Sequence, residues 1–310
     1  MTDQKVLLRR VLLVALSIIA VGFIGNAVRH TPITWETVRE LVSWRTFAWA
    51  MLPCLAMLCA KAVLQTLLIE DFRGRDHAWW LTLSAYAEAQ LIRYVPGKVW
   101  GVIYQGERLS AHTPRAVIWH TNLAQMVATN INGLAVMGGL MLIVVGYRVF
   151  GAITLAFGAA VTAWLLFSNV LTQWVRIGVR FGWPGELVRK VAHKPFRAAG
   201  QVALLEFEWV TYYLCWIVLL HAQHDWLNAI VIGTVYAGAS LIGLLVVIMP
   251  SGWLVREAAF VWLGGYTALP SDQLLVLGLV ARLFFMAGDA LCAVLLMTMN
   301  FGHRMRTHAN

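Results

Sequence analysis

The stretch "LLVLGLVARLFFMAGDALCAVLLMT", residues 274–298, is apolar along almost its whole length and contains only two charged side chains, Arg282 and Asp289. A helix needs about 20 predominantly apolar residues to cross the hydrocarbon core of a bilayer. Helix is the structure expected here, because it satisfies its backbone hydrogen bonds within one segment where water is absent. The stretch therefore predicts a membrane-spanning helix with two charges inside it.

Six further apolar windows of 18 residues or more lie elsewhere in the chain, at residues 11–28, 47–69, 116–145, 150–171, 202–220 and 227–249. Hydrophobic residues make up 60% of the chain and charged residues 13%, which is far from the composition of a soluble domain. We therefore expect an all-α, polytopic helical integral membrane protein, with a single transmembrane domain over residues 1–310. The first window follows three cations but lacks a good cleavage site, so we interpret it as an uncleaved anchor rather than a signal peptide.

The formal charge of +9 is concentrated in a few connections, which indicates how the chain is oriented. The stretch 172–200 is a basic loop with a single acid, Glu186, and loops of this kind lie on the cytoplasmic side. Both terminal segments are also basic, whereas 221–226 and 267–273 contain no Lys or Arg. We therefore expect both termini in the cytoplasm, a location in the inner (cytoplasmic) membrane, and no nucleic-acid partner.

Two further segments are apolar but interrupted by proline and glycine, and one of them must supply another crossing. Seven spans would place the termini on opposite sides of the membrane, so we expect about eight crossings. Segment 78–106 has basic flanks on both sides, which favours a re-entrant hairpin from the cytoplasm. Segment 250–266 ends in an uncharged loop, which favours a short or broken crossing.

The first interruption is "RYVPGKVWG", residues 93–101, in which Arg93 and Lys98 flank Pro96 and Gly97. Proline removes a backbone donor and glycine tolerates torsions that other residues do not, so a helix is expected to break here. Such a break frees backbone N–H groups, and the start of a half-helix is an anion site. The segment therefore predicts a phosphate-binding site, and the alternative is a surface turn with two solvated cations.

The second interruption, "MPSGWLVREAAFVWLGG" at residues 249–265, repeats this plan. Pro250 and Gly252 break the helix, and Arg256 and Glu257 follow one turn later. Paired broken helices with nearby charge are typical of transporters that hold a substrate at mid-membrane. We therefore expect cations from both interruptions to form one site.

Other charged side chains also lie inside apolar windows, where each costs roughly 2.5–3.5 kcal/mol at mid-membrane. We expect Lys61 to snorkel toward the surface, and Glu206 and Glu208 to stand near the cytoplasmic start of their helix. Arg282 and Asp289 are seven residues apart, so they should share one helix face. Asp289 either pairs with a neighbouring cation or carries a proton.

Window 116–145 has one polar half, which either lines a hydrophilic groove or hydrogen-bonds to neighbouring helices. Its polar residues are His120, Asn122, Gln125, Asn130 and Asn132. The four cysteines lie inside apolar spans and lack paired metal-ligand spacing, so we expect no disulfide framework, no metal site and no cofactor.

The two interrupted stretches resemble the signature regions of the lysylphosphatidylglycerol synthase transmembrane-region family, also called the flippase-like domain family. Members typically carry Arg/Lys-Tyr-(Ile/Leu/Val)-Pro-Gly and, later, Pro-x-Gly-Gly-x-Gly-(Val/x)-Arg-Glu-Ala. Trp253 and Leu254 stand where the family usually has glycines. The matching positions are Arg93, Tyr94, Pro96, Gly97, Lys98, Pro250, Gly252, Arg256, Glu257 and Ala258.

This resemblance implies a stand-alone transport domain, because no aminoacyl-transferring domain follows Asn310. The expected function is translocation of an anionic lipid between leaflets, either a polyprenyl-phosphate-linked sugar or a phospholipid with or without an aminoacyl group. The expected partner is the lipid's phosphate headgroup. The expected substrate-binding residues are Arg93, Tyr94, Pro96, Gly97, Lys98, Pro250, Gly252, Arg256 and Arg282, and the expected charge-balancing or proton-coupling residues are Glu88, Glu257 and Asp289.

Two other functions remain open. The first is an integral-membrane transferase of lipid-linked sugars, which would need catalytic carboxylates or a metal. The chain has no Asp-x-Asp pair, and its one dense cluster of metal-ligand residues is "HAQHD" at 221–225. We therefore expect no catalytic residues. An accessory subunit would recruit a glycosyltransferase or another lipid-modifying enzyme through the basic loop 172–200, where "WVRIGVRFGW" is amphipathic enough to lie on the membrane surface.

Overall fold

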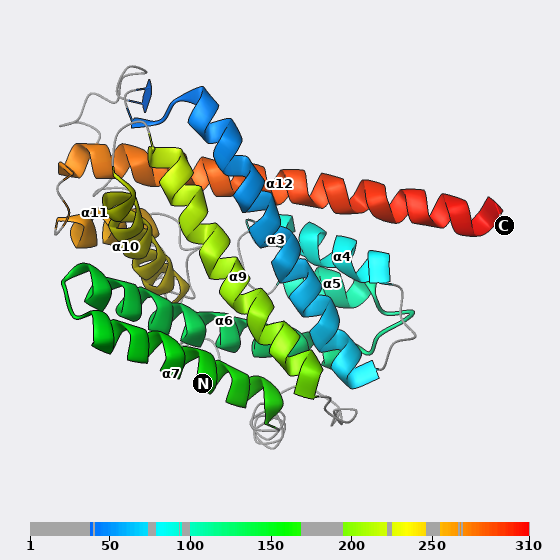
Figure 1. Ribbon diagram of the computed structural model, residues 1–310. Coiled ribbons are helices and arrows are strands. Elements are labelled where there is room, and N and C mark those ends of the chain that lie inside the picture. Colours follow the sequence, from blue (N-terminus) through cyan, green and yellow to red (C-terminus); the bar gives the residue numbers. More distant parts are fainter. Residues whose placement is uncertain are drawn as a thin grey trace, which may run out of the picture. The chain divides into compact units, whose positions relative to one another are not determined.

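The computed structural model of the protein describes residues 38–39, 41–73, 79–92, 94, 100–168, 195–221, 225–245, 255–265, 267 and 269–309. Within these residues the chain is helical and contains no strand (Figure 1). The helices are α3 (Trp44–Arg73), α4 (Trp79–Ile92), α5 (Trp100–Arg108), α6 (Arg115–Val144), α7 (Arg148–Phe167), α9 (Pro195–Leu220), α10 (Trp226–Leu245), α11 (Val255–Gly264) and α12 (Ser271–Ala309).

Six of these helices are long and apolar enough to cross a membrane, namely α3, α6, α7, α9, α10 and α12. They correspond to six of the seven windows predicted from hydropathy. The remaining window, 11–28, lies outside the described residues. The protein is therefore a helical membrane protein, as its composition predicts.

Helix α12 has 39 residues and is thus about 58 Å long at 1.5 Å per residue, almost twice the roughly 30 Å of a hydrocarbon core. Part of it must therefore lie outside the core.

The chain divides into two compact units. The first comprises residues 1–51, 93–98 and 215–285, and the second comprises residues 52–92, 99–214 and 286–310. Helix α12 contributes to both, because the division falls after Phe285. Each unit has its own packing.

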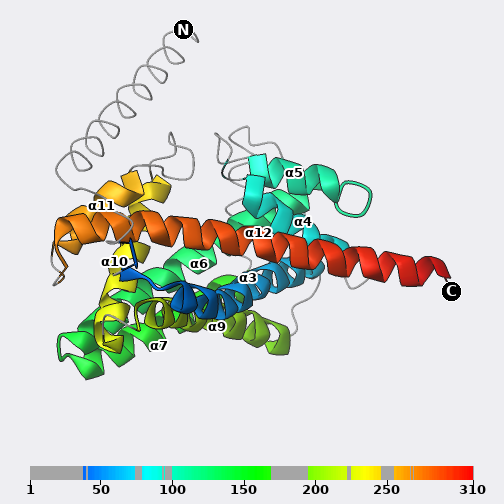
Figure 2. The same ribbon diagram turned by 90° about the horizontal axis from the view of Figure 1, so that it is seen from above.

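In the second unit, α4 and α5 form a closely packed pair on either side of the first predicted interruption (Figure 2). A methyl group added at Gly101 would lie 2.6 Å from the backbone oxygen of Ala89, so only glycine allows this approach. The Tyr104 hydroxyl of α5 donates a hydrogen bond to Glu88 of α4. With 14 and 9 residues, neither helix is long enough to cross a bilayer alone.

The second unit also contains the α6–α7 hairpin, whose helices lie side by side in both views (Figures 1 and 2). Gly139 and Gly151 let the two backbones approach, because a methyl group at Gly151 would lie 2.6 Å from the oxygen of Gly139. Small residues at helix contacts are the usual way in which membrane helices pack. Gly146 has φ of 97° at the turn, a left-handed conformation that ends α6.

In the first unit, α11 packs against α10 and against the first half of α12. Phe260 of α11 contacts Tyr236 of α10, with ring centroids 5.2 Å apart, and also lies against Gly278 of α12. Phe47, near the start of α3, packs edge-on against Phe284 at 5.2 Å. This aromatic packing fixes α11, the helix that follows the second predicted interruption.

Candidate functional site

The candidate site lies in the first unit, where α11 presents two adjacent charged residues to α12. Arg256 and Glu257 occupy the second and third positions of α11, and Glu257 is buried. Arg282 is buried on α12 among apolar neighbours on its own helix, including Ala281 and Phe284. The helix that follows the second predicted interruption thus directs its charged first turn at the one cation of the predicted 274–298 span.

The three side chains form a charged triad around one carboxylate oxygen. Oε1 of Glu257 accepts a hydrogen bond from Nη1 of Arg282 at 2.8 Å and another from Nη2 of Arg256 at 3.3 Å. The exposed fractions of the side chains are 2% for Glu257, 8% for Arg282 and 18% for Arg256. Two guanidiniums therefore share one carboxylate, and the triad carries a net charge of +1.

A net charge is costly in a buried position, because the low dielectric interior does not solvate it. The triad also leaves polar atoms unused. Nε of Arg256 and Oε2 of Glu257 are buried and have no hydrogen-bond partner among the described residues. An anion that accepted a hydrogen bond from Arg256 would both neutralise the charge and satisfy the donor.

An aromatic wall positions Arg256. The guanidinium carbon lies 5.1 Å from the ring centroid of Tyr236, within the range of a cation–π interaction. Tyr236 is itself held by aromatic rings on three sides, with centroid distances of 5.1 Å to Trp216, 5.2 Å to Phe260 and 6.0 Å to Phe285. Its hydroxyl is buried and has no hydrogen-bond partner in the described part of the chain. The ring, rather than the hydroxyl, therefore supports the arginine.

Of the residues expected to bind substrate, the structure brings together Arg256 and Arg282, with Glu257 between them. Tyr94 of the first interruption belongs to the same unit. The other expected substrate-binding residues, Arg93, Pro96, Gly97, Lys98, Pro250 and Gly252, lie outside the described residues.

The other two expected charge-balancing residues, Glu88 and Asp289, are buried in the second unit. Glu88 accepts the hydrogen bond of Tyr104 and lies 3.6 Å from Nε of Arg108. Asp289 lines a small cavity of about 10 Å³ with Leu58, Tyr86, Ala87, Gln90 and Cys292. Both Arg282 and Asp289 are buried on α12, in agreement with a shared face at a spacing of seven residues.

The polar half of α6 serves mainly for hydrogen bonding to neighbouring helices, one of the two alternatives left open by the sequence. Asn122 donates to Oε1 of Gln105 at 2.8 Å, and Gln125 donates to the backbone oxygen of Lys61 at 3.0 Å. Thr121 accepts from Gln65 at 3.0 Å. Asn132 is buried and is the side-chain hydrogen-bond partner of Glu206 on α9.

Two predictions from the sequence are wrong in the second unit. Lys61 does not snorkel freely to the surface, because its Nζ lies 3.0 Å from Oε1 of Glu208. Glu206 and Glu208 are not near the start of their helix, because α9 begins at Pro195 rather than at residue 202. The apolar window misplaced this start, since the preceding turns of α9 contain the polar residues Arg197 and Gln201, which pair with Glu70 and Asp71 of α3.

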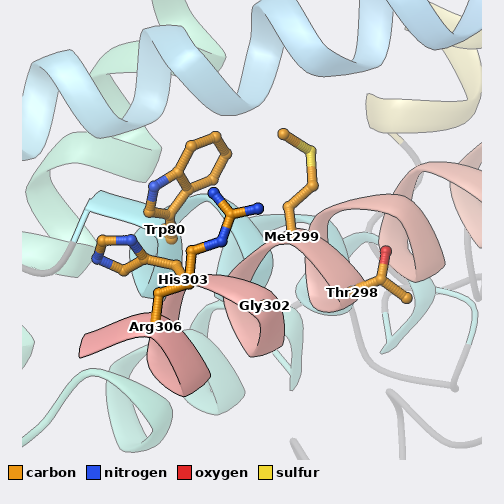
Figure 3. Close-up of a pocket in the computed structure, with 6 residues that line it drawn as sticks. All are labelled: Trp80, Thr298, Met299, Gly302, His303 and Arg306. Atoms are coloured by element: carbon orange, nitrogen blue, oxygen red, sulfur yellow. The ribbon is translucent and has the colours of Figure 1, made fainter. Parts of the chain in front are cut away.

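The structure also contains an open pocket of about 380 Å³ at the C-terminal end of α12 (Figure 3). Arg306 and His303 extend from α12 toward Trp80 of α4, and the His303 and Trp80 rings are 6.4 Å apart. These groups would suit an anionic headgroup at the membrane surface. Arg306 and His303 are exposed, however, so solvent screens their charge more strongly than that of the triad.

Among the described residues, no group of three or more His, Cys, Asp or Glu side chains is placed to hold a metal ion. His221 and Asp225 of the "HAQHD" cluster are described, whereas His224 lies outside the described residues. The fold and the site thus define a helical membrane protein with a buried cationic triad. No family model matches the chain, and no similar sequence was found among curated proteins.

Proposed function

We propose that the protein moves an anionic lipid between the leaflets of the inner membrane, and that Arg256 and Arg282 hold the phosphate of its headgroup. The supporting observation is the triad, in which the buried guanidinium of Arg282 and the partly buried guanidinium of Arg256 share a single oxygen of Glu257. Arginine is well suited to this role, because its planar fork of donors matches two phosphate oxygens at once.

The net charge of the triad provides the mechanism by which it would bind and move a phosphodiester headgroup. Without substrate, Glu257 neutralises one of the two guanidiniums and holds both in place. A phosphodiester carries one negative charge, so its binding to the triad produces a neutral cluster. Because a net charge is what the membrane interior disfavours, the neutral complex lowers the barrier that the headgroup meets on its way across. The acyl or prenyl tails remain in the bilayer throughout.

The two interruptions would supply the rest of the site. A pyrophosphate linkage, as in many polyprenyl-linked sugars, carries more charge than the triad can neutralise. Arg93 and Lys98 would provide the additional cations, which agrees with their place in the motif that resembles the flippase-like domain family. In this proposal Tyr94, which lies in the same unit as the triad, joins the first interruption to the second.

The test is a transport assay in reconstituted vesicles with a fluorescent anionic phospholipid, whose arrival in the outer leaflet is measured by quenching with a membrane-impermeant reductant. Arg256→Glu reverses one charge of the triad and should abolish transport while leaving expression and elution in detergent intact. Arg115→Gln is the matched control, because Arg115 pairs with Glu107 on the exposed surface at 2.7 Å. Transport by Arg256→Glu at the wild-type rate would show that the triad does not carry the substrate.

No observation on the described residues specifically supports either of the two alternative functions, the transferase or the accessory subunit. Of the basic loop 172–200, only residues from Pro195 onward are described, and these already belong to α9. There Arg197 bonds to Glu70, and its Nε lies 2.9 Å from Oδ1 of Asp71. This arginine therefore fixes α9 to α3 and is committed within the chain.

A further inference from the structure

A second group of charged residues lies in the second unit and includes no residue assigned to lipid binding. Glu206 and Glu208 are the twelfth and fourteenth residues of the 26-residue helix α9. At 1.5 Å per residue they lie about 16–20 Å along the helix from its start, which is close to its middle. Carboxylates at this depth of a membrane helix usually mark proton or ion pathways, because their burial is otherwise unfavourable.

One cation faces these two carboxylates among the described residues. Lys61 of α3 approaches Oε1 of Glu208 to 3.0 Å, and the exposed fractions of the two side chains are 25% and 4%. The neighbours from α6 are uncharged, since Asn132 lies beside Glu206 and Thr129 lies beside Glu208. If all three groups were ionised, the cluster would carry a net charge of −1 within the membrane.

The surroundings make this charge unfavourable. Leu205 packs with Leu64, Leu68, Ala128 and Leu166 in an apolar cluster contributed by four helices. Trp209 of α9 also packs tightly against α6, since a methyl group at Gly133 would lie 2.3 Å from its ring. Apolar and aromatic side chains thus surround α9 at the level of the two carboxylates.

Polar side chains of α6 meet the two carboxylates at the same place. Asn132 is the side-chain hydrogen-bond partner of Glu206, and Thr129 is that of Glu208. A protonated carboxyl group is a donor as well as an acceptor, so a protonated Glu206 would be able to donate to the amide oxygen of Asn132.

We propose that Glu206 and Glu208 form an intramembrane proton-binding site that holds one proton, with Lys61 neutralising the second carboxylate. Glu208 remains ionised as the partner of Lys61, and Glu206 takes up the proton to become a neutral carboxylic acid. A sodium ion is disfavoured at the same position, because the Lys61 ammonium group already occupies the cation side of the cluster and would repel it. The site gives the protein a group whose charge responds to the proton concentration, independently of whether it transports lipid.

Infrared spectroscopy of the full-length protein in vesicles tests this proposal directly, because the carbonyl stretch of a protonated carboxylic acid is separate from that of a carboxylate. We expect such a band in the wild type that disappears as pH rises. Glu206→Gln should lose the band, whereas Glu206→Asp should keep it with a changed midpoint. Glu107→Gln, which alters an exposed carboxylate, is the matched control and should retain it.

Glutamine has the shape of the protonated acid, so Glu206→Gln is expected to fold and to elute as the wild type does. A band that is absent from the wild type, or that persists in Glu206→Gln, would overturn the proposal. A midpoint that moves with sodium concentration at constant ionic strength would overturn it in favour of a metal cation. Lipid transport is not needed for any of these readouts, so failure here is distinct from failure of the proposed function.

Discussion

Arg282 donates from Nη1 to Oε1 of Glu257 at 2.8 Å, and this bond joins the first turn of α11 to the middle of the first half of α12. The same oxygen also receives Arg256, so the position of both guanidiniums depends on a single carboxylate. Glu257 is therefore the residue on which the structure of the candidate site depends, whatever anion the site binds.

Glu257→Gln should destabilise the protein strongly. The substitution preserves the shape of the side chain but leaves the buried guanidinium of Arg282 and the partly buried guanidinium of Arg256 without a counter-charge. Removal of one partner from a buried ion pair costs about 3–5 kcal/mol, because the remaining charge is uncompensated. Thermal unfolding of the detergent-solubilised protein measures the loss. The double variant Glu257→Gln/Arg282→Met removes one of the two cations and should recover part of it. No recovery in the double variant would argue that the ion pair does not explain the effect.

Tyr236 provides a sharper test of how Arg256 is held. Tyr236→Leu removes the aromatic face beneath the guanidinium, an interaction worth about 0.5–2 kcal/mol, and should lower the transport rate by a factor of about 2–30. Tyr236→Phe keeps the ring and removes a hydroxyl that is buried and unmatched among the described residues, so it should leave the rate unchanged. The vesicle assay distinguishes the two. Equal losses in both variants would assign a role to the hydroxyl rather than to the ring.

Hydropathy predicted the long helices because the length and composition of a membrane span are local properties of the sequence. Six windows correspond to such helices, and α4 and α11 end or begin next to the predicted proline–glycine segments. The proximity of Arg256 and Glu257 could also be predicted from the sequence alone, since the two residues are adjacent. These features needed no knowledge of the tertiary contacts.

The contacts between residues on different helices could not be predicted from the sequence. Lys61 is far from Glu208 along the chain, and nothing local distinguishes a lysine that pairs internally from one that snorkels. Tyr236 lies in an ordinary apolar window, so no charge or break marks it as the support of Arg256. The start of α9 was placed too late because polar turns that precede an apolar window do not register as part of a span.

The close packing of α4 against α5 predicts that replacement of Gly101 by a larger residue destabilises the protein. Gly101→Ala places a methyl group 2.6 Å from the backbone oxygen of Ala89, which cannot move without shifting α4. Overpacking of this kind costs about 1–3 kcal/mol. Gly200→Ala is the matched control, because nothing lies within 4 Å of the added methyl and alanine favours a helix by about 0.5–1 kcal/mol. The thermal midpoint should therefore fall for Gly101→Ala and stay or rise for Gly200→Ala. A fall of equal size in both would show that the close approach at Gly101 is not what matters.

The pairing of Lys61 with Glu208 can be separated from snorkelling by a double-mutant cycle. Lys61→Met leaves the buried carboxylate of Glu208 without its cation and should destabilise the protein by about 3–5 kcal/mol. If Lys61 snorkelled, the same substitution would be close to neutral, because methionine fits an apolar surface equally well. Lys61→Met/Glu208→Met removes both charges, and burial of two apolar side chains there should restore most of the lost stability. Thermal unfolding of the three variants gives the coupling between the two residues. A coupling near zero would show that the two charges stabilise the protein independently and would remove Lys61 from the cluster on α9.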